Sequence, residues 1–395
     1  MDPTATVLFI LVYYQGANMY YTFKKEIQPT TAQQLSLFNT TSIKTPSKIQ
    51  HITLYKNTFS DKQKEVALNL EQHFINGAQH ILNLFKKPIT ETMKEYYYTF
   101  KIPKKTHGFR EINAPIDFLK IAQKDITHLF TRLGLLTHSA AYAYIPGKNH
   151  FNAMQAHQEN NSKWFLKLDI TDFFPSCTKE LVLQKLQNLY PICLWKDTTI
   201  TLLESLIQLC CLNGALPQGS PASPMLSNLI FIEYDYKIME LLKNPPTTIT
   251  KQKYTYTRYA DDMCISAHIN FDWQTLFFQI QDILGTSFIL KQEKTRYGTS
   301  AGRNWNLGLM LNKDNKITTG AVNKRNIKAM LCNFIAAEKA EKPYSIHEIQ
   351  HLLGLLNYAK QIEPEYIEYI IQKYSTKYAF PIMEKIKTKL KTGER

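Results

Sequence analysis

The chain has few cysteines and no pattern that pairs them. Its six cysteines, among 395 residues, form no Cys-x-x-Cys pair, and no secretory signal precedes them, which predicts reduced thiols in a cytoplasmic protein. An apolar stretch of 18 residues is also lacking, and the run from Val7 to Tyr14 is too short to cross a bilayer. We therefore expect no membrane anchor, and we expect that run to form a strand or a packed helix.

Acidic residues are scarce relative to basic ones. The 33 Asp and Glu residues face 47 Lys and Arg residues, which gives a net charge of +14. This excess favours a polyanionic partner, although a merely basic soluble protein would show it too. The hydrophobic content of 44%, with 12% aromatics, suits a packed core and excludes a disordered chain.

The apolar periodicity predicts mixed secondary structure. A helical period runs over 61–86, strand-like segments cover 96–102 and 110–114 around a turn at 104–108, and a further helix follows Pro115. Residues 15–60 are polar without a clear period. After residue 320 three helices are predicted, over 322–339, 345–362 and 364–374, and they carry many basic residues. The order indicates a mixed α+β body followed by a helical module.

Two predicted strands deliver carboxylates to their ends. The apolar run from Trp164 to Leu168 is followed by Asp169, and residues 254–266 predict a hairpin with Ala260-Asp261-Asp262 at its turn. Between them, Ser223 as N-cap and Pro224 as first helical residue predict the start of a helix.

Three converging aspartates can hold divalent metal ions. Phosphoryl transfer needs charge neutralisation and in-line positioning, which two Mg²⁺ ions about 3.5–4 Å apart can supply. Mg²⁺ prefers oxygen ligands, and a few carboxylates together with substrate phosphates suffice to hold it. A lone Asp-Asp pair is usually a solvated turn, but here the pair lies between β-rich runs and Asp169 ends a second apolar strand.

Three segments resemble the palm motifs of reverse transcriptases. Residues 259–262 (YADD) resemble the Y-x-D-D box, residues 168–174 (LDITDFF) the first palm motif, and residues 216–221 (LPQGSP) the loop before the palm helix. They occur in family order at family-like spacing, within a resemblance that runs from about residue 104 to about residue 371. The resemblance implies an α+β right-hand polymerase whose two Mg²⁺ ions, replaceable by Mn²⁺, are held at Asp169, Ile170, Asp261 and Asp262.

The same resemblance implies roles for further residues. Phe174 would be the aromatic gate under the sugar of the incoming nucleotide, which favours dNTPs over rNTPs. Gln218 and Gly219 would line the nucleotide pocket, Arg110 would grip the triphosphate, and Lys294 would lie near the leaving pyrophosphate. Residues 305–309 (WNLGL) resemble the hairpin that supports the primer end, and nucleic-acid contacts are expected at Lys324, Arg325 and Lys328.

Several features are typical of retron and related bacterial defence reverse transcriptases. They are residues 108–115 (GFREINAP), residues 152–157 (NAMQAH), which resemble the N-A-x-x-H signature with one more residue before the histidine, and residues 354–358 (GLLNY) with 362–364 (IEP). Retron enzymes usually carry V-T-G where this chain has Asn306-Leu307-Gly308. That triplet is associated with recognition of the cognate RNA, so a sister class of defence reverse transcriptases stays open.

The expected organisation follows the polymerase plan. An N-terminal extension covers 1–60, fingers 61–163, a palm with inserted finger helices 164–318, and a helical thumb 319–395. The implied partners are a structured non-coding RNA template, dNTPs and a DNA or RNA–DNA product. An effector protein or second polymerase subunit is a further expected partner, and the implied setting is antiviral defence.

Other functional classes remain open from the sequence. His347-Glu348-Ile349-Gln350-His351 is formally an H-E-x-x-H zinc motif with Glu368 as a distant third ligand, although Ser345 makes a capping box that explains Glu348. A catalytically idle RNA-binding scaffold would suit the basic charge. An RNA-dependent RNA polymerase is a further alternative, which Phe174 disfavours.

Overall fold

The computed structural model describes residues 5–12, 20–27, 59–85, 93–104, 108–245, 249–300, 305, 308–342 and 344–392. The N-terminal run forms strand β1 (Ala5–Val12), antiparallel to β2 (Tyr20–Ile27), so of the strand and the packed helix expected there the strand is formed. The rest of the predicted extension up to residue 58, the tip of the turn at 105–107, and Asn306 and Leu307 lie outside the described residues. Within the described ranges, no helix is long and apolar enough to span a membrane.

Two compact units are formed, each from two segments of the chain. The first comprises Met1–His138 and Asp172–Tyr234, and the second comprises Ser139–Thr171 and Asp235–Arg395. Both units interleave along the sequence, whereas the expected extension, fingers, palm and thumb follow one another. That four-part division stays a prediction.

The core of the first unit is helical. Helix α3 (Asp61–Asn83) begins at a capping box between Ser60 and Gln63 and packs against α4 (Asp117–Arg132) and α8 (Asp197–Cys210). The buried ring of Phe74 lies 4.5 Å from that of Trp195 and 6.2 Å from that of Phe130, measured between centroids. The helices predicted over 61–86 and after Pro115 are thus confirmed.

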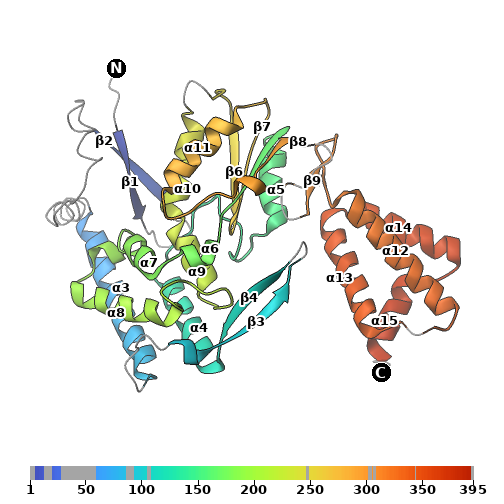
Figure 1. Ribbon diagram of the computed structural model, residues 1–395, viewed down its shortest axis with the longest axis horizontal. Helices are drawn as coiled ribbons and strands as arrows, with labels where there is room; N and C mark the ends of the chain where they lie inside the picture. The colour runs from blue at the N-terminus through green and yellow to red at the C-terminus, as the bar shows by residue number, and fades with distance from the viewer. Residues whose placement is uncertain are drawn as a thin grey trace. The chain divides into compact units, whose positions relative to one another are not determined.

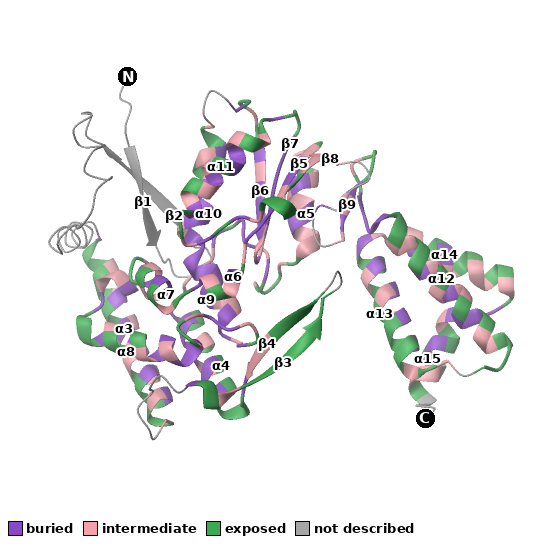
Figure 2. Ribbon diagram, viewed as in Figure 1, coloured by how far each residue is buried: buried purple, intermediate pink, exposed green. Residues whose placement is uncertain are grey.

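A two-stranded ribbon extends from these helices. Strands β3 (Tyr97–Pro103) and β4 (Phe109–Pro115) pair antiparallel, as predicted (Figure 1). Strand β3 is largely exposed, whereas β4 is exposed at its start and becomes buried at Pro115 (Figure 2). The remaining elements of this unit are short: η2 (Met93–Tyr96), α6 (Phe173–Ser176), α7 (Lys179–Leu186), η3 (Ile192–Leu194) and α9 (Ser223–Ile230), with α10 (Ile232–Lys243) beginning at its end.

The predicted N-cap at Ser223 is wrong. Helix α9 starts at Ser223 itself, its N-cap is Ala222, and Pro224 stands in the first turn as expected. The Ser223 hydroxyl donates to the carbonyl oxygen of Pro217 at 2.8 Å. Because that bond fastens the preceding loop to the helix, the hydroxyl is used in a tertiary contact rather than as a local cap.

An antiparallel sheet forms the centre of the second unit. Its strand order is β6 (Tyr254–Tyr259), β7 (Asp262–Ala267), β5 (Trp164–Asp169) and β8 (Arg296–Thr299). The middle strands β5 and β7 are mostly buried (Figure 2). Helix α5 (His150–Glu159) packs against β6, and α11 (Trp273–Leu284) and η4 (Gln292–Lys294) precede β8. The predicted hairpin and the strand before Asp169 are both confirmed.

Helices complete the second unit. After the short strands β9 (Met310–Leu311) and β10 (Ile317–Thr318) come α12 (Gly320–Lys339), α13 (Ile346–Ile362), α14 (Pro364–Tyr378) and α15 (Ile382–Thr392). They enclose one apolar cluster that includes Leu331, Phe334, Leu352 and Ile386. The three predicted helices are confirmed. Helix α15 was not predicted, because its few apolar residues are separated by lysines.

Candidate active site

Strand pairing brings two of the three aspartates face to face. Asp169 is the last residue of β5 and Asp262 the first of β7, and the two are partners in the antiparallel register. Side chains of directly opposed residues project from the same face of a sheet. The Ile170 N–H donates to the carbonyl oxygen of Asp261 at 3.3 Å, which fastens the end of β5 to the hairpin turn.

The third aspartate stands in the turn itself. Ala260 and Asp261 join β6 to β7, and Ala260 adopts a left-handed φ of +58°. A two-residue hairpin turn with positive φ at its first position usually carries glycine there. Here the residue is alanine, so the surrounding structure must hold this backbone in place.

Lysines pair with two of the carboxylates. Lys167 Nζ lies 2.9 Å from Asp262 Oδ2, and Lys294 Nζ lies 3.0 Å from Asp169 Oδ1. Lys291 Nζ is 3.5 Å from the same Asp169 oxygen. Partial burial opposes charge on Lys294, but its hydrogen bond to Asp169 and the charges of Asp169 and Asp261 outweigh this and raise its pKa.

The carboxylates influence one another electrostatically. Burial raises the pKa of Asp261, and the negative charges of Asp262 and Asp169 raise it further, against the smaller opposing effect of Lys294. The part of this rise that comes from Asp262 and Asp169 is what like charges held close together produce. Such a cluster is stabilised by a cation that neutralises it.

The donor set suits a hard divalent cation. Carboxylate oxygens are the ligands that Mg²⁺ prefers, and Asp169, Asp261 and Asp262 supply them from one sheet edge and its turn. Among the described residues, however, no group of three or more His, Cys, Asp and Glu side chains has the arrangement of a metal site. Asp169 and Asp262 are instead hydrogen-bonded to lysines. The metal assignment, including Ile170, stays a prediction.

In the first unit, the expected nucleotide loop is fastened to β4. The Asn113 N–H donates to the Gln218 carbonyl oxygen at 2.8 Å. Gly219 has a φ of +127°, and a Cβ added to it would lie 2.7 Å from the Asn113 carbonyl oxygen. Glycine is thus required here by the close approach of β4. Arg110, on the same strand, is exposed.

Replacing Gly219 by alanine should displace this loop. Gly214→Ala is the matched control, because Gly214 also has a positive φ, of +77°, but open space around it. We expect the control to cost about 1 kcal/mol from backbone strain alone. Gly219→Ala should cost about 1–3 kcal/mol more, since backbone must move. Urea unfolding of both variants measures the difference, and equal losses would contradict the close-packing account.

The two phenylalanines after the first carboxylate have different environments. Phe173 is buried, and its ring packs 5.3 Å from that of Phe231. Phe174 is only partly buried, and its ring contacts Phe173 edge-on at 5.4 Å. Phe173 therefore belongs to the core, whereas Phe174 exposes part of a ring that packs on Phe173. A partly exposed ring at Phe174 suits the predicted sugar gate, which stays a prediction.

The histidine of the N-A-x-x-H signature is packed in the second unit. His157 on α5 is fully buried, with Nδ1 2.6 Å from Ser266 Oγ and Nε2 2.8 Å from Thr257 Oγ1. Burial lowers the pKa of His157 to about 3. The side chain fastens α5 to strands β6 and β7, so its role here is structural.

This histidine should make the fold acid-sensitive. The unfolded imidazole has a pKa near 6.5, whereas the folded one stays neutral down to about pH 3. The unfolded state therefore binds the proton first, and the free energy of unfolding should fall by about 1.4 kcal/mol per pH unit below about pH 6.5.

Urea unfolding between pH 7.5 and 4.5 measures this dependence. His157→Gln should flatten it, whereas a control substitution at the exposed His347 should not. Identical pH dependence in all three proteins would contradict the assignment.

The predicted nucleic-acid lysines lie at the start of α12. Lys324 Nζ pairs with Glu363 Oε1 at 2.5 Å and lies 4.4 Å from the Tyr366 ring centroid, while Lys328 lies 5.8 Å from the same centroid. Arg325 is exposed. Glu363 also accepts the Thr319 N–H at 2.9 Å, so Lys324 takes part in fastening α12 to the start of α14.

In the H-E-x-x-H segment, the glutamate takes part in the predicted capping box. Ser345 and Glu348 exchange hydrogen bonds at the start of α13, which confirms the capping box. Glu368 pairs with Lys360 at 3.0 Å. Because His347, Glu348 and His351 form no metal-binding group with a further ligand among the described residues, nothing in the structure favours a zinc peptidase.

Sequence reasoning missed several residues around the turn. Lys167 lies two residues before Asp169, and the period of two along a strand could have placed it on the same face. The buried Arg258, next to the YADD box, had no such signal. Nor did His150, whose ring stacks on Tyr358 and lies edge-on to Tyr259.

Comparison with known proteins identifies similar sequences. A family model described as reverse transcriptase (RNA-dependent DNA polymerase) matches residues 102–335. The chain is 31% identical to the Retron Ec83 reverse transcriptase of Escherichia coli, over 71% of this chain and 87% of that protein. It is 26% identical to the Retron Ec73 reverse transcriptase of the same species, over 69% and 85%. The Retron Mx65 reverse transcriptase of Myxococcus xanthus is 28% identical, over 70% and 64%.

Solved structures give a more distant likeness. Telomerase from Candida tropicalis, in complex with a TWJ fragment of telomeric RNA, aligns at 12% identity with a TM-score of 0.41, over 72% of this chain and 55% of that chain. The corresponding Candida albicans complex gives 12% and 0.39, over 71% and 54%. The chain spans about half the length of these telomerase chains.

Proposed function

Because the chain belongs to the reverse transcriptase family, in the group of bacterial retron enzymes, and is an RNA-directed DNA polymerase with the α+β right-hand fold of that family, we propose that Asp169, Asp261 and Asp262 form its catalytic centre. Two Mg²⁺ ions, replaceable by Mn²⁺, are the proposed cofactor. When bound, they would activate the primer 3′-hydroxyl and steady the leaving pyrophosphate.

The observation that carries this proposal is the register of the central sheet. Asp169 and Asp262 are paired residues on neighbouring strands, and Asp261 lies next to Asp262 in the turn between β6 and β7. The pKa of Asp261 is raised first by burial and then by the charges of Asp262 and Asp169, which supports three carboxylates lying close together.

The other side chains have roles in binding and charge balance. Lys294, 3.0 Å from Asp169, is proposed to neutralise the pyrophosphate as it leaves. Arg110, Gln218 and Gly219 are proposed to bind the dNTP, and Phe174 to exclude the 2′-hydroxyl. Lys324, Arg325 and Lys328 are proposed to contact nucleic acid, with Arg325 the most available of the three because it is exposed.

The proposed template is a dedicated structured non-coding RNA, copied into DNA in the cytoplasm as part of antiviral defence. The support is the similarity to retron reverse transcriptases. An effector protein or second subunit belongs to the same proposal. Sequencing the nucleic acid that co-purifies with the protein tests it: one enriched RNA carrying its own complementary DNA supports it, and a random RNA population counts against it.

Association with the template should depend steeply on salt. The +14 net charge implies phosphate contacts, each of which releases counterions, so the affinity for an RNA–DNA duplex should fall about 10³-fold or more between 50 and 200 mM salt. Fluorescence anisotropy of a labelled duplex measures this slope. Arg325→Ala should reduce the slope by about one. A flat response would contradict a cleft that tracks phosphates.

Primer extension provides the direct assay for the proposed centre. Purified protein should add dNTPs to a primer on an RNA template when Mg²⁺ or Mn²⁺ is supplied, and chelation should stop it. Extension that persists after exhaustive chelation would rule out the proposed metal centre.

A further inference from the structure

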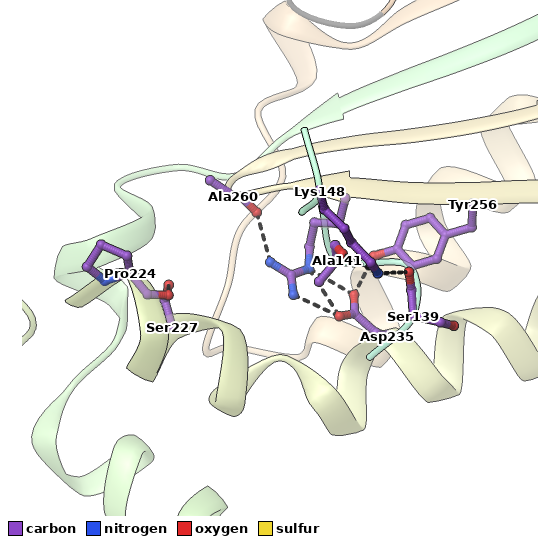
Figure 3. Close-up of polar contacts among 9 residues, drawn as sticks. Ser139, Ala141, Lys148, Pro224, Ser227, Asp235, Tyr256 and Ala260 are labelled. Carbon is purple, nitrogen blue, oxygen red and sulfur yellow. Dashed lines mark hydrogen bonds and ion pairs between the residues drawn. The ribbon is translucent and has the colours of Figure 1, made fainter. Parts of the chain in front are cut away.

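A fully buried ionic cluster adjoins the candidate catalytic turn. It consists of Asp235 on α10 with Tyr256 and Arg258 on β6, and both charged side chains are completely buried. Arg258 donates from Nε to Asp235 Oδ1 at 2.9 Å and from Nη2 to Oδ2 at 2.8 Å, while the Tyr256 hydroxyl donates to Oδ1 at 2.7 Å (Figure 3). A buried ion pair is often no more stabilising than apolar residues of the same size, so stability alone does not account for it.

The remaining end of the guanidinium reaches the turn. Arg258 Nη1 donates to the carbonyl oxygen of Ala260 at 3.2 Å (Figure 3). That carbonyl belongs to the peptide joining Ala260 to Asp261, so its direction sets where Asp261 projects. Ala260 holds the left-handed φ of +58° that glycine normally supplies. A backbone of this kind persists only where its surroundings over-determine it.

The main chain of Arg258 is held as well. Its N–H donates to the Ala140 carbonyl oxygen at 2.7 Å, and its carbonyl oxygen accepts the Tyr142 N–H at 2.9 Å. Lys148 Nζ in turn donates to the carbonyl oxygens of Ser139 and Ala141, at 2.9 and 3.0 Å (Figure 3). Backbone and side chain together leave the guanidinium little freedom to move.

We propose that Arg258 is a positioning residue for the catalytic turn: anchored by Asp235, its guanidinium holds the Ala260–Asp261 peptide in the conformation that presents the Asp261 carboxylate. The inference rests on the proposed catalytic role of Asp261. The guanidinium pairs with both Asp235 oxygens through Nε and Nη2 and reaches the Ala260 carbonyl through Nη1. A lysine ammonium is a single point of charge on a flexible stem, so it does not reproduce this rigid fork.

Arg258→Lys is the first test, because it keeps the charge beside Asp235 and removes the donor to Ala260. We expect kcat for single-nucleotide extension to fall about 10- to 100-fold, since a misplacement near 1 Å costs about that much. KM for the dNTP and duplex affinity should stay within about threefold. Tyr254→Phe is the matched control on the same strand, because the Tyr254 hydroxyl donates to the Thr250 carbonyl oxygen and not to the cluster. This variant should extend primers normally.

Rescue separates positioning from general packing. Adding Ala260→Gly to Arg258→Lys supplies a residue that adopts the positive φ unaided, and kcat should recover at least threefold. A folded Arg258→Lys protein with normal kcat would overturn the inference. So would a loss that Ala260→Gly leaves unchanged.

A second variant guards against misfolding. It replaces the cluster by apolar groups of similar size through three substitutions, Asp235→Leu, Tyr256→Phe and Arg258→Met. Proteins often keep their stability when a buried ion pair is replaced in this way. The triple variant should fold, lose kcat and regain it with Ala260→Gly. Asp261→Ala, measured in the same assay, distinguishes failure of the proposed catalytic centre from failure of the role proposed for Arg258. If it extends primers normally, the proposed centre fails; if it is inactive while the folded triple variant has normal kcat, only the role of Arg258 fails.

Discussion

Replacing Asp261 by alanine should abolish primer extension, with kcat lower by about a thousandfold or more, and Asp169→Ala should do the same. Each substitution removes one of the three carboxylates that the register of β5 and β7 and the adjoining turn bring to one sheet edge. Loss of charge stabilisation worth several kcal/mol in the transition state corresponds to a rate loss of this size. Single-nucleotide extension on an RNA template, measured under single-turnover conditions, gives the rate directly.

A nearby aspartate provides the control. Asp172 is exposed and has a left-handed φ of +41°, which asparagine also tolerates, so Asp172→Asn should extend primers normally. Duplex affinity should survive in all three variants, because phosphate contacts come from basic side chains. The Asp169 variant leaves Lys291 and Lys294 without their carboxylate, so thermal melting should accompany the assay. Normal extension by either alanine variant would rule out the proposed centre.

Phe174→Val should let the enzyme use ribonucleotides. The ring of Phe174 is partly exposed and is supported edge-on by Phe173, so a smaller side chain leaves space where a 2′-hydroxyl could fit. Discrimination by the size of an apolar group is worth about 10- to 200-fold. The ratio of kcat/KM for dNTP over rNTP should therefore fall by about that factor, measured with each nucleotide on the same RNA template.

Phe173→Val is the matched control for the gate. Phe173 is buried against Phe231, so its truncation should lower stability by about 1–3 kcal/mol and leave sugar discrimination unchanged. If Phe173→Val relaxed discrimination and Phe174→Val did not, the gate would be assigned to the wrong ring. Unchanged discrimination in both variants would show that neither ring touches the sugar.

Local sequence signals predicted most of the secondary structure. The capping box at Ser345, the period of α3 and the Y-x-D-D hairpin are short-range patterns, and short-range interactions suffice to form them. The failures have tertiary causes. Ser223 was expected to cap a helix, but its hydroxyl bonds to Pro217. Helix α15 is held by Ile382 and Ile386 in a shared core rather than by a strong pattern of its own.

The functional residues divide in the same way. Asp169, Asp261 and Asp262 could be predicted, because each lies at the end of a strand or in the adjoining turn, in a motif with known order. Lys291 and the Arg258–Asp235 pair could not, since their roles depend on which strands and helices become neighbours. The strand period could have placed Lys167 on the face of Asp169, but not its pairing with Asp262. His157 was singled out by its motif, but only the structure shows it buried between two hydroxyls as a packing residue.

By itself, the sequence determined which chemical groups are available: three carboxylates at strand ends, a phenylalanine pair and an excess of positive charge. Tertiary structure alone decided how those groups are held. The pairing of β5 with β7 sets Asp169 opposite Asp262, and a guanidinium buried against Asp235 holds the turn that carries Asp261. The physical reason is that composition and period act over a few residues, whereas charge neutralisation and burial are set by residues distant in sequence that folding makes neighbours.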